Sequence, residues 1–177
     1  MFLLAAYQLI ALAFVRKAQR WSREVLGLKR FYIVPAHPLF LRLILRRRVP
    51  LPEGRNYYFI HLRGNRPAGG TAAERIKMYS REIDEDIRRA LSAPRLNGAV
   101  FVANTPMEFG KRRLDLLRRA GWEVMTAEGQ FIGLQNLYAN RKAAQRKLFG
   151  KAVKRHVASR HKHWTIYVLR APVYPEN

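Results

Sequence analysis

The sequence predicts an α/β fold: a small, mostly parallel sheet of about four strands with crossover helices, preceded by a helical, basic N-terminal extension. Short runs rich in aromatic and β-branched residues alternate with longer stretches of helical periodicity. Capping boxes mark helix starts after such runs, and helices between strands favour parallel neighbours. We expect an extension of residues 1–54 and an α/β domain of residues 55–177 with a basic C-terminal helix.

The extension opens with an apolar run, residues 2–15, that basic residues follow at once, beginning with Arg16 and Lys17. A membrane-spanning helix needs about 20 apolar residues, and this run is shorter. The run also lacks the positive start and clear cleavage site of a secretory signal. Four interpretations stay open: a helix packed on protein, a short membrane anchor with a positive-inside flank, an import signal, and an interfacial helix.

Residues 37–48 (HPLFLRLILRRR) predict a short helix or strand, since prolines stand on both sides as breakers. Arg46, Arg47 and Arg48 end this segment. Three consecutive arginines after an apolar run are able to clamp phosphates. The alternative is the solvated end of a short buried helix.

The first half of the α/β domain predicts a strand, a helix and a strand. Residues 56–62 are aromatic and β-rich. Thr71 and Glu74 form a capping box, and apolar residues recur at helical spacing as far as about Ser92. Residues 98–103 (GAVFVA) read as a buried strand.

The second half continues the alternation. We expect a helix capped by Thr105, with Glu108 closing a second capping box and Gly121 as the C-terminal stop. Strands are expected at residues 122–126 and 164–169, and a long helical stretch from about residue 131 to 159 lies between them.

Two motifs have non-functional interpretations. The glycine-rich turn at residues 64–71 outlines a phosphate loop, but Gly70 stands where the motif requires lysine. A capped turn between strand and helix is the preferred interpretation. The acidic run at residues 82–86 is expected to be a solvated helix face, because its carboxylates spread around the helix axis.

No catalytic or metal-binding constellation emerges, so we expect neither an enzyme nor a cofactor. His156, His161 and His163 do not have the spacing of known zinc motifs, and their basic neighbours would repel a cation. The chain has no cysteine, which rules out disulfides and thiolate metal sites and fits a reducing or redox-indifferent compartment.

Positive charge dominates the chain: 34 Lys and Arg against 12 acids, a formal net charge of +22. The excess lies at the two ends, and residues 141–163 contain nine basic residues, three histidines and no acid. Such a surplus indicates a polyanionic partner. The residues expected to contact it are Arg46, Arg47, Arg48, Arg112, Arg113, Arg141, Lys142, Arg146, Lys147, Lys151, Lys154, Arg155, Arg160 and Lys162.

The leading hypothesis is a structural, non-catalytic RNA-binding component of a large ribonucleoprotein, resembling a ribosome in composition. Its partners would be RNA of the ribosomal kind and neighbouring proteins. We expect an intracellular location, with the mitochondrion or another organelle among the candidates. The alternative is a membrane-associated accessory subunit, anchored through residues 2–15 and in contact with anionic lipid. A nucleic-acid-acting enzyme is the third hypothesis.

Overall fold

Five strands form one mixed sheet in the part of the chain that the computed structural model describes, residues 2–45, 48–63, 70–105, 109–129 and 164–174. Four helices and a short 3-10 turn accompany the sheet in these ranges. The elements in chain order are α1 (Phe2–Glu24), β1 (Phe31–Pro35), α2 (Pro38–Leu45), β2 (Tyr57–Leu62), α3 (Ala72–Leu91), η1 (Pro94–Leu96), β3 (Val100–Thr105), α4 (Lys111–Arg119), β4 (Glu123–Glu128) and β5 (Thr165–Arg170).

The strand order is β1-β2-β3-β5-β4, and this corrects the prediction of a mostly parallel sheet of about four strands. Only β2 and β3 pair in parallel, with Tyr57 opposite Val100. The other neighbouring strands, β1 with β2, β3 with β5 and β4 with β5, are antiparallel. The α/β class and the four predicted strands are confirmed.

Two features of the chain path explain the difference. Strand β1 comes from the predicted extension and pairs antiparallel to the edge of β2. Helix α4 returns the chain so that β3 and β4 run in the same direction, as alternation predicts. Strand β5 then inserts between β3 and β4 and runs against both of them. Alternation of helices and strands sets direction but not order, so it cannot reveal such an insertion.

The helix starts were predicted unequally well. The capping box of α3 is confirmed, because Thr71 Oγ1 accepts from Glu74 N and the Glu74 carboxylate accepts from Thr71 N. The second predicted cap is wrong: Thr105 closes β3 opposite Thr165, and α4 begins only at Lys111. The pairing with β5 extends β3 to Thr105, the residue predicted to cap the helix.

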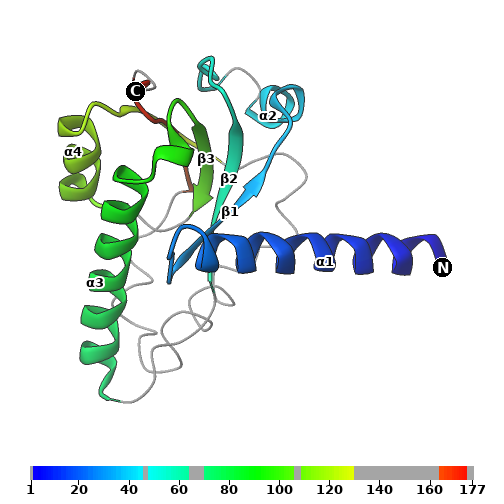
Figure 1. Cartoon of the computed structure of the whole chain (residues 1–177), viewed down its shortest axis with the longest axis horizontal. Coiled ribbons are helices and arrows are strands. Elements are labelled where there is room, and N and C mark those ends of the chain that lie inside the picture. The colour runs from blue at the N-terminus through cyan, green and yellow to red at the C-terminus, as the bar shows by residue number, and fades with distance from the viewer. Residues whose placement is uncertain (1, 46–47, 64–69, 106–108, 130–163, 175–177) are drawn as a thin grey trace.

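The helices cover both faces of the sheet (Figure 1). Helices α3 and α4 close one face over a core that includes Ile83, Phe101 and Trp122. Helix α2 covers the opposite face, where Leu41 and Ile166 belong to a second buried cluster. The C-terminal half of α1 packs on β1 on this second face.

Residues on both sides of the expected boundary at residue 54 contribute to this one sheet. Within the segment 37–48, Pro38–Leu45 forms helix α2, which is one of the two structures predicted there. The apolar run 2–15 and the basic residues after it lie in one continuous helix, α1. Within the described ranges, no helix combines the length and the apolarity that a membrane crossing requires. The helix expected at residues 131–159 lies outside the described residues.

Candidate polyanion interface

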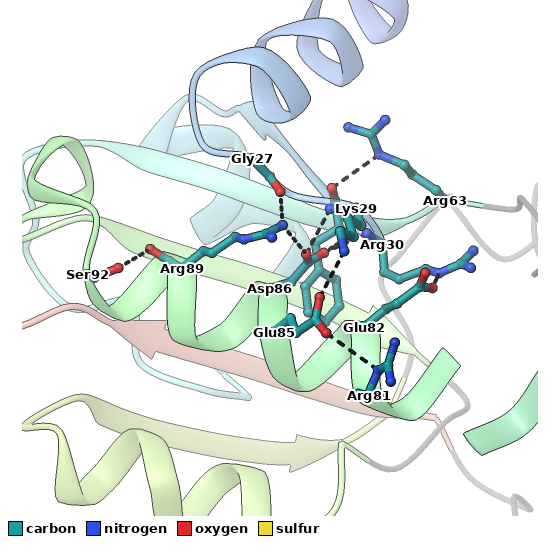
Figure 2. Close-up of polar contacts among 11 residues, drawn as sticks. Gly27, Lys29, Arg30, Arg63, Arg81, Glu82, Glu85, Asp86, Arg89 and Ser92 are labelled. Atoms are coloured by element: carbon teal, nitrogen blue, oxygen red, sulfur yellow. Dashed lines mark hydrogen bonds and ion pairs between the residues drawn. The ribbon is translucent and has the colours of Figure 1, made fainter. Parts of the chain in front are cut away.

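Asp86 joins the N-terminal segment to α3 and is completely buried (Figure 2). Its carboxylate accepts hydrogen bonds from three consecutive backbone N–H groups, those of Lys29 at 2.8 Å, Arg30 at 2.6 Å and Phe31 at 2.8 Å. Nη1 of Arg89, on the same helix, lies 3.9 Å from Oδ1 of Asp86. A buried charge is stable only when its lone pairs are satisfied in this way. Asp86 therefore fixes the start of β1 against α3.

Basic side chains extend this attachment on either side of Asp86 (Figure 2). The Arg30 guanidinium forms an ion pair with Glu82 and lies 5.0 Å from the centre of the Tyr79 ring. Lys29 donates to Glu85 at 3.0 Å, and this hydrogen bond lowers the pKa of the Glu85 carboxyl. Several of the basic residues near the N-terminus thus neutralise acids of the domain.

The acidic run was therefore misread as a solvated face. Asp86 is 0% exposed, and Asp84 binds Arg113 at 2.7 Å. The sequence spacing indicates that Asp86 is buried, although this was overlooked. Asp86 follows Ile83 by three positions and Tyr79 by seven. That spacing places a residue on the same apolar helix face. A charged residue on such a stripe is a candidate for a buried anchor.

Arg112 and Arg113 are neighbours in sequence with different surroundings. Arg113 donates to Asp84, to the Ser80 carbonyl at 3.1 Å and to Ser80 Oγ at 2.6 Å, so it joins α4 to α3. Arg112 is exposed on the outer side of α4. The structure gives Arg113 a role inside the domain and leaves Arg112 accessible to a partner.

The acids of the described residues are largely engaged with groups of the same domain. Besides the pairs above, Asp115 binds Arg118 at 3.2 Å and Glu123 lies 3.7 Å from Arg170. Glu74 caps α3. The basic residues outnumber these acids, so the outward surface carries the positive excess. Exposed basic residues include Arg16, Lys17, Arg20, Arg23, Arg42, Lys111, Arg112 and Arg119.

Arg48 lies beside Gly129, the last described residue before the segment 130–163. A β-carbon at Gly129, the residue after β4, would come within 3.3 Å of Arg48 Cζ. The Gly129 N–H donates to the Trp164 carbonyl at 2.8 Å, and β5 starts at the next residue. Asn104 also donates to the Gly129 carbonyl at 2.9 Å. Gly129 and Trp164, the described residues on either side of the segment 130–163, therefore lie next to each other, and Gly129 lies beside Arg48.

The remaining predicted contact residues lie outside the described residues. Arg46 and Arg47 belong to this group, as does the whole cluster from Arg141 to Lys162. The histidines at positions 156, 161 and 163 and most of the glycine-rich turn lie there too.

One cavity of the described interior is smaller than a typical small-molecule site. A cavity of about 50 Å³ between the sheet, α3 and α4 is lined almost wholly by apolar side chains, among them Phe31, Ile87 and Trp122. Typical small-molecule sites measure about 300–1,000 Å³. In the described ranges, no three His, Asp or Glu side chains gather in a way that could hold a metal ion.

Comparison with protein-family models, curated proteins and solved structures finds no match to this chain.

Proposed function

We propose that the protein is a non-catalytic RNA-binding component of a large ribonucleoprotein. The observation that carries the proposal is the proximity of Arg48 to Gly129, which in turn donates to the Trp164 carbonyl. Arg48 is the last residue of the arginine triplet, and Gly129 and Trp164 are the described residues on either side of the segment 130–163. Two sequence clusters proposed to bind polyanion are thus connected along the chain to residues at one corner of the sheet.

The chemistry of these clusters suits a nucleic-acid backbone. Residues 141–163 carry nine basic side chains and no acid. Each phosphate that such a side chain neutralises releases a condensed counterion, and this release drives association without reading sequence. Arginine adds bidentate hydrogen bonds to phosphate oxygens. A surface of this kind holds RNA in place and does not select bases.

The internal pairs of the domain support the same proposal. Arg30 and Arg113 bind acids and stabilise the fold, so they explain a part of the positive charge. Arg16, Lys17, Arg42 and Arg112 are exposed and add to the positive charge of the surface. A polyanionic partner would relieve their mutual repulsion.

The test is RNA binding by the nuclease-treated full chain, measured by filter retention of a labelled single-stranded RNA over a range of salt concentrations. The variant replaces Arg46, Arg47 and Arg48 by Gln. A matched control replaces Lys77, Arg88 and Arg95 by Gln and so removes the same charge. These three residues are exposed and lie away from this corner.

For the triplet variant, we expect the slope of log affinity against log salt to become less negative by about two. This change corresponds to three lost phosphate contacts on single-stranded RNA. The control variant should keep the wild-type slope. Equal losses in both variants would mean that net charge alone attracts RNA, and no binding by the wild-type chain would reject the proposal.

A further inference from the structure

Helix α2 is apolar on two faces, and only one of them belongs to the core. Leu41, Ile44 and Leu45 are buried against the sheet. Leu39 and Leu43 are 65% and 69% exposed. A surface helix of a globular domain normally turns polar side chains outward. An outward apolar face of this kind indicates a surface that becomes covered.

Helix α1 adds to the same side of the molecule. Val15 and Ala18 pack in a cluster with the β1 side chains and Phe59 of β2. Phe40 of α2, itself 48% exposed, makes an edge-on contact with the Phe59 ring at 6.1 Å. Phe59 thus links α1 and α2. Figure 1 shows the N-terminal half of α1 extending past the sheet on this side.

Exposed basic residues accompany the apolar ones. Arg42 lies on α2 between Leu39 and Leu43, and it is exposed. Arg16, Lys17 and Arg20 are exposed on α1, directly after Phe14, which is 48% exposed. Apolar side chains next to arginine and lysine are the combination by which interfacial helices bind anionic bilayers.

We propose that α2 and α1 dock on an anionic phospholipid bilayer. The docking surface consists of Phe14, Leu39, Phe40 and Leu43 with Arg16, Lys17 and Arg42. The apolar side chains enter the interfacial region while the basic ones contact lipid phosphates. The helices lie along the bilayer and do not cross it. This inference goes beyond RNA binding and does not depend on it.

Charge complementarity favours a bilayer over a second copy of the chain. A twofold dimer through this surface would bring the same patch of each copy together. Arg16, Lys17 and Arg42 would then face their own counterparts, and like charges oppose such contacts. An anionic lipid surface matches them instead.

The test is co-sedimentation of the nuclease-treated full chain with vesicles of phosphatidylcholine alone or mixed with phosphatidylglycerol. The variant is Leu39→Gln with Leu43→Gln. Both side chains are mostly exposed, so the fold should tolerate the change, and a thermal melt checks this. The matched control is Ile76→Gln with Leu116→Gln, both 40% exposed, on α3 and α4.

We expect the wild-type chain to bind the phosphatidylglycerol vesicles and to bind phosphatidylcholine weakly. The α2 variant should lose at least about tenfold in partitioning, because each buried leucine contributes to binding. The control should bind as the wild type does. A second variant, Arg16→Gln, Lys17→Gln and Arg42→Gln, should lose binding to the anionic vesicles and keep its fold. RNA affinity of the α2 variant should be unchanged, which separates this proposal from the previous one.

Three results would overturn the docking proposal. Wild-type chain that sediments with neither kind of vesicle would do so, as would an α2 variant that binds as tightly as the control. The third is a concentration-dependent dimer in analytical ultracentrifugation, abolished by the α2 variant, without vesicle binding. That result would identify a second copy as the occupant.

Discussion

The Asp86 carboxylate accepts the backbone N–H of Arg30 at 2.6 Å across 56 positions of sequence. Asp86 is fully buried and Arg30 is 6% exposed. This hydrogen bond connects the segment before β1 to the centre of α3. It shows that the N-terminal basic region is part of the folded domain, and it identifies the residue whose change should disturb the fold most.

Replacing Asp86 by Asn should reduce the free energy of unfolding by about 2–4 kcal/mol. Asparagine keeps the shape but offers one acceptor oxygen, and its NH₂ group would face backbone donors. Urea denaturation measures the loss. The matched control is Asp115→Asn, a change in an exposed ion pair that should cost less than about 1 kcal/mol. Equal stability of Asp86→Asn and the wild type would contradict the anchoring role.

Replacing Arg113 should reduce the stability of the fold more than replacing Arg112. Arg113→Gln removes the hydrogen bonds to Asp84 and Ser80, and we expect a loss of about 1–2 kcal/mol. Arg112→Gln alters an exposed side chain and should stay within about 0.5 kcal/mol of the wild type. Urea midpoints of the two variants give the comparison. The opposite ranking would mean that α4 is joined to α3 in another way.

His61 should make the fold sensitive to mild acid. Burial lowers the pKa of His61 from 6.5 to about 4, and its ring stacks on Tyr32 at a centroid distance of 5.1 Å. Below pH 6.5 the unfolded chain takes up a proton that the folded histidine does not. Stability is therefore lost as the pH falls from 6.5 towards 4, by at most about 3 kcal/mol from this group.

The measurement is the unfolding free energy at about pH 7 and pH 4.5 for the wild type and for His61→Phe. Phenylalanine keeps the aromatic packing and cannot be protonated, so this variant should lose less stability on acidification. Carboxyl groups titrate in both proteins, and their contribution cancels in the difference. An identical loss in both proteins would show that His61 is already accessible to protons in the folded state.

Gly129 should accept a side chain only at a cost in stability. Its backbone φ is 133°, a region that favours glycine, and Arg48 occupies the position a β-carbon would need. We expect Gly129→Ala to cost about 1–3 kcal/mol in unfolding free energy. Gly110→Ala is the control, because φ there is 83° but no atom lies within 4 Å of the new β-carbon.

A double-mutant cycle with Arg48→Ala isolates the contact between the two residues. Part of the cost of Gly129→Ala should disappear when Arg48 is already Ala, because the collision is removed and only backbone strain remains. Strict additivity would mean that the Arg48 guanidinium makes no costly contact with a β-carbon at Gly129.

Features that depend on neighbours in the sequence were predicted, and features that depend on pairing between distant segments were not. Local signals identified the capping box of α3 and the four strands of the α/β domain, because they depend on neighbours in sequence. Strand β1 was overlooked because the chain around Phe31–Pro35 lies among basic residues that indicated an extension. The position of β5 between β3 and β4 depends on pairing over distances that periodicity does not encode.

The same division applies to the candidate site. Composition located the basic clusters but did not separate Arg113, which binds Asp84, from Arg112, which is exposed. The helical spacing of Arg113 to Leu117 is four residues, and Leu117 is buried. A helical-wheel projection of α4 therefore places Arg113 on the same face as the buried Leu117 and Arg112 on a different one. The proximity of Arg48 to Gly129 had no counterpart in the sequence.

The most direct test of RNA binding is sedimentation of the native protein from its own cells. Detergent extracts are run on density gradients with and without ribonuclease. The account predicts migration with a heavy particle and a shift to light fractions after ribonuclease treatment. Migration that is the same with and without ribonuclease would contradict it.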